Sequence, residues 1–236
     1  FRNAERTRLH APEFTMLEWY RRGMDYTDIM HDCEKLLCAV SKATGISAIK
    51  DCYLMHEFER LSVTTAFRNY AGIDLIDCLD DIATFTKAAT AQGVRVAPGD
   101  DWSDIFHAVM AEKIEPFLGT HAPTILYDYP SSMACLAKKA FDQRFAERFE
   151  LYINGVELAN AFSELTDATE QRKRFQHEMA DKQERYGFSY PLDEDFLSAL
   201  EYGMPEAGGI ALGLDRLVML LVGANSIDDV LWTKKP

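Results

Sequence analysis

Two arginines near opposite ends of the chain stand in surroundings suited to binding a triphosphate. Arg2 lies in a predicted strand that a polar turn joins to a second strand, and Arg216 opens a predicted helix after a glycine-rich strand. Guanidinium groups stay charged and offer planar, paired donors that match phosphate oxygens. One such group at each end is what a triphosphate needs, so the two positions together indicate a triphosphate site.

The strand predicted over 13 to 21 carries a second set of candidate binding residues. Because side chains alternate between the two faces of a strand, its two faces differ. One face holds Phe14, Met16, Glu18 and Tyr20, and the other holds Thr15, Leu17 and Trp19. A carboxylate between aromatic side chains suggests a surface that binds a ligand.

Periodicity and turn residues predict an α+β fold, an antiparallel sheet flanked by helices. Asn154-Gly155 is a strong hairpin signal, and Gly45 follows the end of a predicted helix. The strands are expected at 1–7, 13–21, 124–129, 146–153, 156–163 and 207–214. The helices are expected at 26–42, 73–79, 81–92, 101–111, 168–186 and 193–202, with a last one beginning at Asp215.

The composition is that of one globular domain. The chain has 236 residues, of which 47% are hydrophobic and 27% charged. No apolar run approaches the roughly 18 to 20 residues of a membrane span, and no secretory leader opens the sequence, so a soluble cytoplasmic protein is expected. The five cysteines show no Cys-x-x-Cys spacing, which favours neither disulfides nor zinc. The net charge of -13 disfavours a polyanionic partner such as tRNA.

The arginine-bearing segments resemble motifs 2 and 3 of class II aminoacyl-tRNA synthetases. Motif 2 corresponds to residues 1–21 and motif 3 to 207–223, while 147–165 is similar to the segment that lysyl-tRNA synthetases place between them. The resemblance implies one catalytic domain over 1–236 with a helical insertion at about 60–118. Motif 1 is missing, and because the chain begins with Phe1 we expect that residues preceding it were removed or are not included in this sequence.

Two details resemble the elongation factor P lysine ligases, paralogues of lysyl-tRNA synthetase. One is the segment Leu17-Glu18-Trp19-Tyr20-Arg21; the other is Ala211, where the tRNA-charging enzymes usually have glycine. This resemblance implies an ATP- and Mg²⁺-dependent ligase that adenylates lysine or (R)-β-lysine and transfers it to a lysine side chain of elongation factor P. It further implies a homodimer, no membrane and no tRNA.

The resemblance assigns roles to individual residues. Arg2 and Arg216 are the catalytic residues, holding the α- and γ-phosphates. The ATP site is implied to contain Arg2, Glu5, Arg8, His10, Phe14 and Arg216, with Phe14 stacking on adenine. The magnesium ligands are Glu150 and Glu157, hard oxygen donors. The amino-acid pocket contains Glu18, Tyr20, Asn160, Phe162, Glu164 and Ala211, with Glu164 facing the substrate ammonium, because a buried carboxylate needs a cationic partner.

One position departs from the family. Ala4 stands where motif 2 carries glutamate, so Glu5 replaces that acid or an ATP contact is lost. Two alternatives stay open on the sequence: a lysyl-tRNA synthetase core that charges tRNA, and a non-catalytic regulator that keeps the synthetase shape. The sequence leaves undecided which lysine isomer is preferred.

Overall fold

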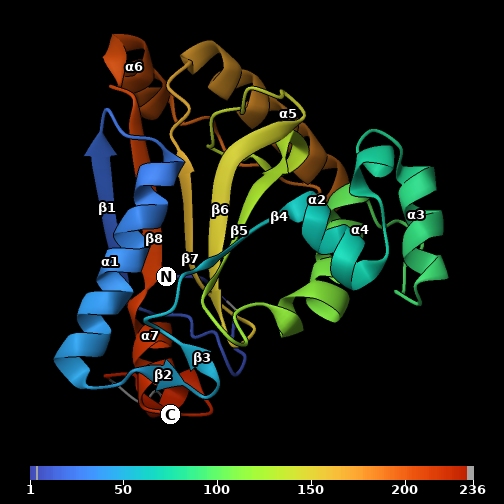
Figure 1. Cartoon of the computed structure of the whole chain (residues 1–236). Helices are drawn as coiled ribbons and strands as arrows, with labels where there is room; N and C mark the ends of the chain where they lie inside the picture. Colours follow the sequence, from blue (N-terminus) through green and yellow to red (C-terminus); the bar gives the residue numbers. More distant parts are fainter. Residues whose placement is uncertain (4, 233–236) are drawn as a thin grey trace.

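The computed structural model describes residues 1–3 and 5–232, and its centre is a twisted six-stranded sheet (Figure 1). The strand order is β1-β8-β7-β6-β5-β4, so the first and last long strands of the chain lie side by side. The strands are β1 (Met16–Arg22), β4 (Glu59–Ser62), β5 (Thr124–Pro130), β6 (Phe145–Ile153), β7 (Val156–Ser163) and β8 (Ala207–Gly213). The short strands β2 (Ala48–Ile49) and β3 (Cys52–Tyr53) form a separate pair.

The predicted fold class is confirmed, with one difference in the sheet. Every neighbouring pair is antiparallel except β4–β5, which is parallel. The hairpin β6–β7 turns where it was expected, because Asn154 (φ 49°) and Gly155 (φ 71°) both adopt the left-handed conformation that such a turn requires. Strands β2, β3 and β4 were not predicted, since each has at most four residues and too little alternation to recognise.

The strand predicted over 1–7 is wrong. The described residues before β1 form turns, with a single bridge between Thr7 and His10. The backbone N–H of Arg2 donates to the carbonyl of Pro12 at 2.8 Å, which closes the segment into a loop. In such a loop, backbone groups can form hydrogen bonds within the segment or with water, so the segment needs no partner strand. The effect of Ala4 lies outside the described residues.

The predicted helices agree with the observed ones to within a few residues, except that 73–79 contains only a 3-10 helix, Leu75–Cys78, and that α2 was not predicted. The observed helices are α1 (Tyr26–Thr44), α2 (Val63–Ala66), α3 (Ile82–Ala91), α4 (Trp102–Val109), α5 (Ala168–Tyr186), α6 (Glu194–Gly203) and α7 (Leu214–Leu221). The longest apolar-faced helix, α1, begins at a capping box in which Asp25 accepts from Asp28 N and Asp28 accepts from Asp25 N. It ends at Gly45, whose φ of 74° suits the left-handed cap.

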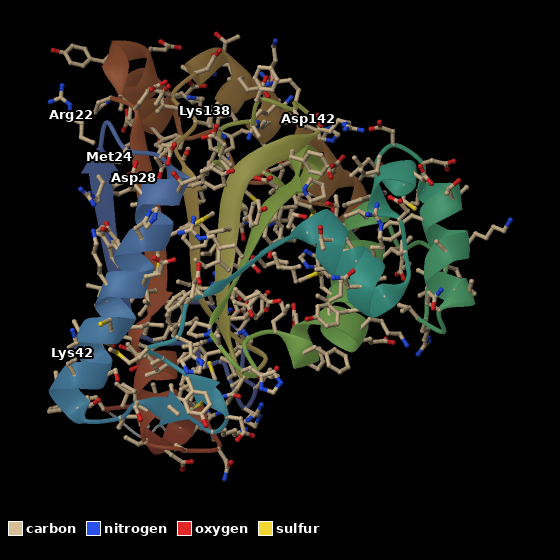
Figure 2. All side chains as sticks on the ribbon, viewed as in Figure 1. Arg22, Met24, Asp28, Lys42, Lys138 and Asp142 are labelled. Atoms are coloured by element: carbon tan, nitrogen blue, oxygen red, sulfur yellow. The ribbon has the colours of Figure 1, made fainter. Side chains whose placement is uncertain are left out.

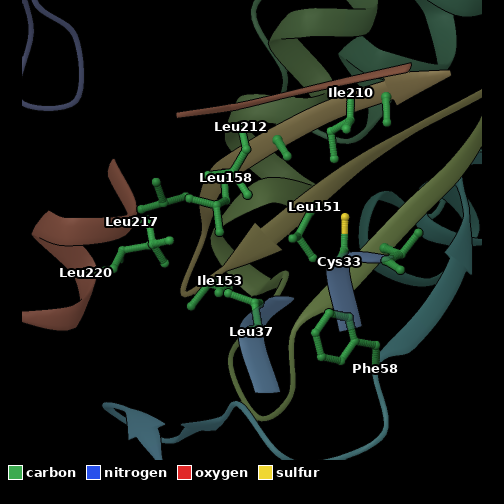
Figure 3. Close-up of a cluster of buried hydrophobic side chains, with 14 of the residues drawn as sticks. Cys33, Leu37, Phe58, Leu151, Ile153, Leu158, Ile210, Leu212, Leu217 and Leu220 are labelled. Carbon is green, nitrogen blue, oxygen red and sulfur yellow. The ribbon is translucent and has the colours of Figure 1, made fainter. Parts of the chain in front are cut away.

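The main core lies between α1 and one face of the sheet (Figure 3). Cys33 and Leu37 of α1 are fully buried against Leu151 and Ile153 of β6. Burying one side chain of this size contributes about 1.5 to 3 kcal/mol. This core fixes one face of the sheet and so determines which side chains must point to the other face.

A second core lies beyond β5, under the helices of residues 63–118. Phe67, Phe85 and Phe106 pack there with Trp102, their rings 5.1 to 6.2 Å apart. Figure 1 shows α2, α3 and α4 to one side of the sheet, away from α1. In the described part of the chain, no helix is long and apolar enough to cross a membrane.

Candidate active site

The sheet face opposite α1 carries the polar residues that the sequence singled out. Cross-strand register brings Glu18, Ala211, Asn160 and Glu150 into one row over β1, β8, β7 and β6. The next row consists of Tyr20, Gly209, Phe162 and Arg148. We call this surface the site face; alternation puts it on the side that α1 leaves uncovered.

A cavity of about 190 Å³ opens at the end of the site face nearest to the loop before β1. Its lining includes Arg2, Glu5, His10, Phe14, Glu157, Asn160, Ala211 and Arg216. The structure therefore brings together residues more than 200 positions apart in sequence, as the triphosphate hypothesis requires. Arg2 lies with its guanidinium carbon 5.9 Å from the Phe14 ring centroid, and 61% of its side chain is exposed. Its guanidinium group can thus reach a ligand.

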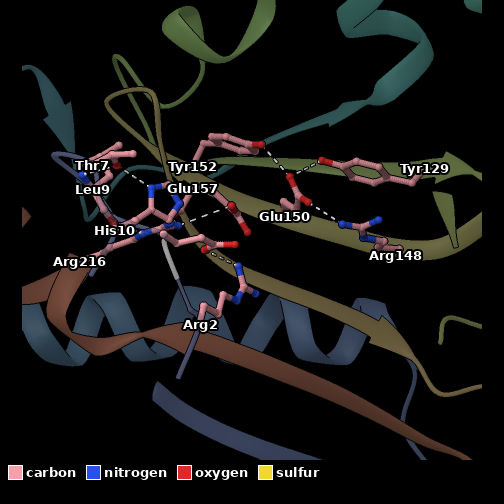
Figure 4. A network of polar contacts seen from close by, with 11 residues as sticks. Arg2, Thr7, Leu9, His10, Tyr129, Arg148, Glu150, Tyr152, Glu157 and Arg216 are labelled. Atoms are coloured by element: carbon pink, nitrogen blue, oxygen red, sulfur yellow. Dashed lines mark hydrogen bonds and ion pairs between the residues drawn. The ribbon is translucent and has the colours of Figure 1, made fainter. Parts of the chain in front are cut away.

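Arg216 lines this cavity and is held by two different segments (Figure 4). Its Nη1 donates to the carbonyl oxygen of Glu157 at 2.6 Å and lies 3.5 Å from the carboxylate of the same residue. Its Nε donates to Leu9 O at 3.3 Å, and Nη2 lies 2.8 Å from His10 Nε2. Arg216 therefore joins the β6–β7 hairpin to the loop before β1, in addition to any contact with a ligand.

The contact with Arg216 determines the protonation of His10. Arginine can only donate, so His10 Nε2 must accept and the ring must be neutral, with Nδ1 donating to Thr7 Oγ1 at 2.8 Å. Burial and the charge of Arg216 both lower the pKa of His10, in agreement with this geometry. A neutral imidazole leaves the positive charge of the cavity to the two arginines.

Glu157 stands where a metal ligand was expected. Desolvation in the cavity, followed by the charge of Glu150, raises the pKa of Glu157 to about 7, although Arg216 partly opposes the effect. Its carboxylate faces the cavity with 40% of the side chain exposed to it. A divalent cation would relieve the repulsion between the two glutamates, so Glu157 fits a magnesium ligand.

Glu150, the other expected metal ligand, already has several partners (Figure 4). Its Oε2 accepts from Tyr129 and Tyr152, each at 2.6 Å, and its Oε1 accepts from Arg148 at 2.7 Å. A carboxylate has about four acceptor positions, so one remains for a cation. No group of three or more His, Cys, Asp or Glu residues within the described ranges could hold a metal unaided. Mg²⁺ bound mainly through phosphates needs only one or two such ligands.

Glu164 lies at the other end of the site face, over Gly209. It is 9% exposed, and among residues 1–3 and 5–232 no hydrogen bond or ion pair holds its carboxylate. Burial raises its pKa to about 7. A Cβ added to Gly209 would touch Glu164 Oε1 and stand 2.7 Å from Tyr20 Cε1, so only glycine leaves this space open. The carboxylate and the Tyr20 ring converge on that space.

A second cavity, of about 250 Å³, lies beyond Glu164 at the start of α1. Glu164 shares its lining with Met24, Asp28 and Lys138, which Figure 2 labels at this end of the molecule. Lys138 is paired there with Glu206 at 3.2 Å rather than with Glu164. The Glu164 carboxylate therefore borders space that water can enter. The backbone N–H of Glu164 donates to Ala207 O, which holds the residue against β8.

Some of the predicted site residues lie away from the first cavity. Arg8 donates to Asn225 O at 3.3 Å and does not line it. Glu18, Tyr20, Phe162 and Glu164 lie further along the site face, and Phe162 packs on a small cluster of alanines. Sequence reasoning missed Arg148 and Gly209. The signal for Arg148 was present, because a charged residue two positions before Glu150 must share its strand face.

The chain is similar to proteins of a known family. A family model described as tRNA synthetases class II (D, K and N) matches residues 1–233. The chain is 41% identical to an elongation factor P--(R)-beta-lysine ligase of Proteus mirabilis, covering 98% of this chain and 68% of that protein. It is 40% identical to the ligase of the same name from Photorhabdus laumondii. It is also 40% identical to a lysine--tRNA ligase of Pelotomaculum thermopropionicum, but spans only 47% of that protein.

Proposed function

Because the chain belongs to the class II tRNA synthetase family of the D, K and N type, we propose that it is an ATP-dependent ligase for lysine or (R)-β-lysine. In this proposal the activated amino acid passes to a lysine side chain of elongation factor P. The names of the similar ligases support that acceptor. The reaction would take place in the cytoplasm, where translation factors act, and the homodimer expected from the family stays a prediction.

The observation that carries the proposal is that side chains of opposite charge lie at the two ends of the site face. Arg2 and Arg216 place two guanidinium groups at one end, each 3.5 Å from one carboxylate, and Glu164 places a carboxylate with no partner among the described residues at the other. A lysine has a carboxylate near one end and an ammonium group at the other. Its carboxylate would lie toward the arginines, where a triphosphate also binds, and its side-chain ammonium would pair with Glu164.

The chemistry expected from these residues is positioning and charge stabilisation. The amino-acid carboxylate attacks the α-phosphorus of ATP, pyrophosphate leaves, and an aminoacyl-adenylate forms. Arg2 would stabilise charge at the α-phosphate and Arg216 at the γ-phosphate, since fixed donors stabilise the charge that develops on those oxygens. The acceptor amine then attacks the acyl carbon, AMP leaves, and an amide results. No protein nucleophile is needed, because the mixed anhydride is already activated.

Magnesium would be held by Glu157, with Glu150 adding its one remaining acceptor position. When bound, the ion supplies charge neutralisation between the phosphates. Glu157 has a pKa of about 7 in the free protein, so its ionisation should be coupled to cation binding. Metal-dependent activity should therefore rise as the pH increases through about 7.

The acceptor is tested by offering both candidates to the same enzyme. Radiolabelled lysine or β-lysine is incubated with ATP and either elongation factor P or tRNA, and label in protein and in RNA is counted. An elongation factor P variant that lacks the modified lysine is the matched control. Label that enters tRNA and not the protein would replace the proposal by a lysyl-tRNA synthetase activity. Ala211, on the site face between Glu18 and Asn160, favours the protein acceptor by resemblance.

A non-catalytic regulator is the remaining alternative. It predicts no lysine-dependent exchange of pyrophosphate into ATP. The convergence of Arg2, Glu157 and Arg216 on one cavity argues against it, because a regulator has no need of a charged cavity at this position. Exchange that depends on lysine or β-lysine would exclude it.

A further inference from the structure

Arg148 of β6 is a buried arginine on the site face to which no role has been assigned. Each of its nitrogens has a separate acceptor: Nη1 donates to Met133 O at 2.6 Å, Nη2 to Glu150 Oε1 at 2.7 Å, and Nε to Asn160 Oδ1 at 3.2 Å. The Tyr129 ring covers its flat face, with Cζ 4.5 Å from the ring centroid. Only 11% of the side chain is exposed, so the guanidinium group has one orientation.

The bond to Asn160 fixes which end of that amide faces the ligand. An arginine has no acceptor, so the Asn160 atom that meets Arg148 Nε must be the oxygen, whichever way the amide would otherwise turn. The Nδ2 amide group then points away from Arg148. Asn160 lines the cavity that holds Arg2 and Arg216, so its two N–H donors are available to that space.

We infer that Arg148 is a positioning residue that makes Asn160 a hydrogen-bond donor to the substrate carboxylate. This inference rests on the proposed function, which places that carboxylate between the arginines and Ala211. If the amide turned over, its oxygen would face the carboxylate and repel it. Arg148 prevents this without touching the substrate.

The partners of Arg148 explain why arginine serves here and lysine would not. Glu150 is held by Tyr129 and Tyr152, so it forms a rigid support for one edge of the guanidinium group. The donor to Asn160 is a different nitrogen, Nε, which lies beside Nη2 on the same edge. A lysine ammonium could stay with Glu150, but it has no second donor at the place of Nε.

The test compares two ligands that differ only in the carboxylate. Lysine and 1,5-diaminopentane are titrated into wild type and into Arg148→Lys, with Arg144→Lys as the matched control. Arg144 is an exposed arginine that pairs with Asp142 at 2.7 Å, and no part in the site is assigned to it. We expect Arg148→Lys to weaken lysine about 10- to 100-fold, the value of a hydrogen bond to a charged group. Binding of 1,5-diaminopentane should stay within about threefold, and Arg144→Lys should change neither.

A second variant tests the orientation directly and keeps both Arg148 and Glu150. Asn160→Asp keeps an acceptor for Arg148 but presents a carboxylate oxygen where the amide donors stood. Lysine binding should be lost while 1,5-diaminopentane binding is kept, and the loss should be smaller when Arg148→Lys is also present. Equal weakening of both ligands in either variant, or unchanged lysine binding, would refute the role of Arg148. Absence of lysine and β-lysine binding by the wild type would instead refute the proposed function.

Discussion

Replacing Glu164 by glutamine should weaken amino-acid binding and stabilise the empty enzyme at the same time. The carboxylate is 9% exposed and has no cationic partner in the described part of the chain, which raises its pKa from 4.5 to about 7. Its charge is therefore unfavourable until a ligand ammonium arrives. Glutamine has nearly the same shape and carries no charge.

The sign and size of the stability effect follow from this shift. The folded protein holds the Glu164 proton more tightly than the unfolded chain, so stability is highest below pH 4.5 and is lost as the pH rises toward 7. Each pH unit in that interval is worth about 1.4 kcal/mol, giving about 3 kcal/mol in total. We take about half, 1.5 kcal/mol, because water in the neighbouring cavity screens the charge.

Whereas Glu164→Gln should make the protein more stable, it should make lysine binding weaker. The variant loses a charge-assisted hydrogen bond worth about 1.5 to 3 kcal/mol, so lysine affinity falls about 10- to 100-fold while ATP affinity stays within about threefold. In the wild type, lysine affinity should fall about tenfold per pH unit below 7, because the carboxylate must first lose its proton. In Glu164→Gln this pH dependence should be absent.

The assays are urea unfolding of both proteins at pH 5 and pH 8, and lysine titrations over the same range. All other groups cancel in the comparison, so the extra stability of Glu164→Gln should appear at pH 8 and shrink toward zero at pH 5. Equal stability of the two proteins at both pH values, or parallel pH profiles for lysine binding, would show that Glu164 has a partner within the protein. The reasoning about the ammonium site would then be wrong.

Three further substitutions test separate parts of the site. Arg216→Ala should reduce ATP–pyrophosphate exchange at least about 100-fold, and exchange within about threefold of wild type would remove Arg216 from the triphosphate site. Gly209→Ala should weaken lysine binding and cost about 1 to 3 kcal/mol of unfolding free energy, because the added methyl meets Glu164 and Tyr20; lysine titration and urea unfolding measure both. Ala211→Gly should raise the use of α-lysine relative to β-lysine about tenfold, measured as the ratio of kcat/KM in adenylation, and an unchanged ratio would exclude a steric role.

The sequence predicted the long elements well because each is marked by strong local signals. Asp25 and Gly45 bound α1, and Asn154-Gly155 fixes the hairpin between β6 and β7. The strand expected over 1–7 failed because its shape depends on distant contacts, including the hold of Arg216 on Leu9 and His10. Contacts of that kind join positions more than 200 residues apart and leave no periodic pattern in the sequence.

From the sequence alone, three of the candidate glutamates could not be ranked. In the structure they differ in the partners of their carboxylates. Glu150 accepts three hydrogen bonds, and Glu157 lies beside Arg216, so both charges are at least partly compensated within the protein. Glu164 is as buried as Glu150 and has no such partner in the described ranges. A buried carboxylate left unpaired costs stability, and folding alone gives no reason to keep one. No described residue compensates its charge, so of the three Glu164 is the one whose neighbour should be the substrate itself.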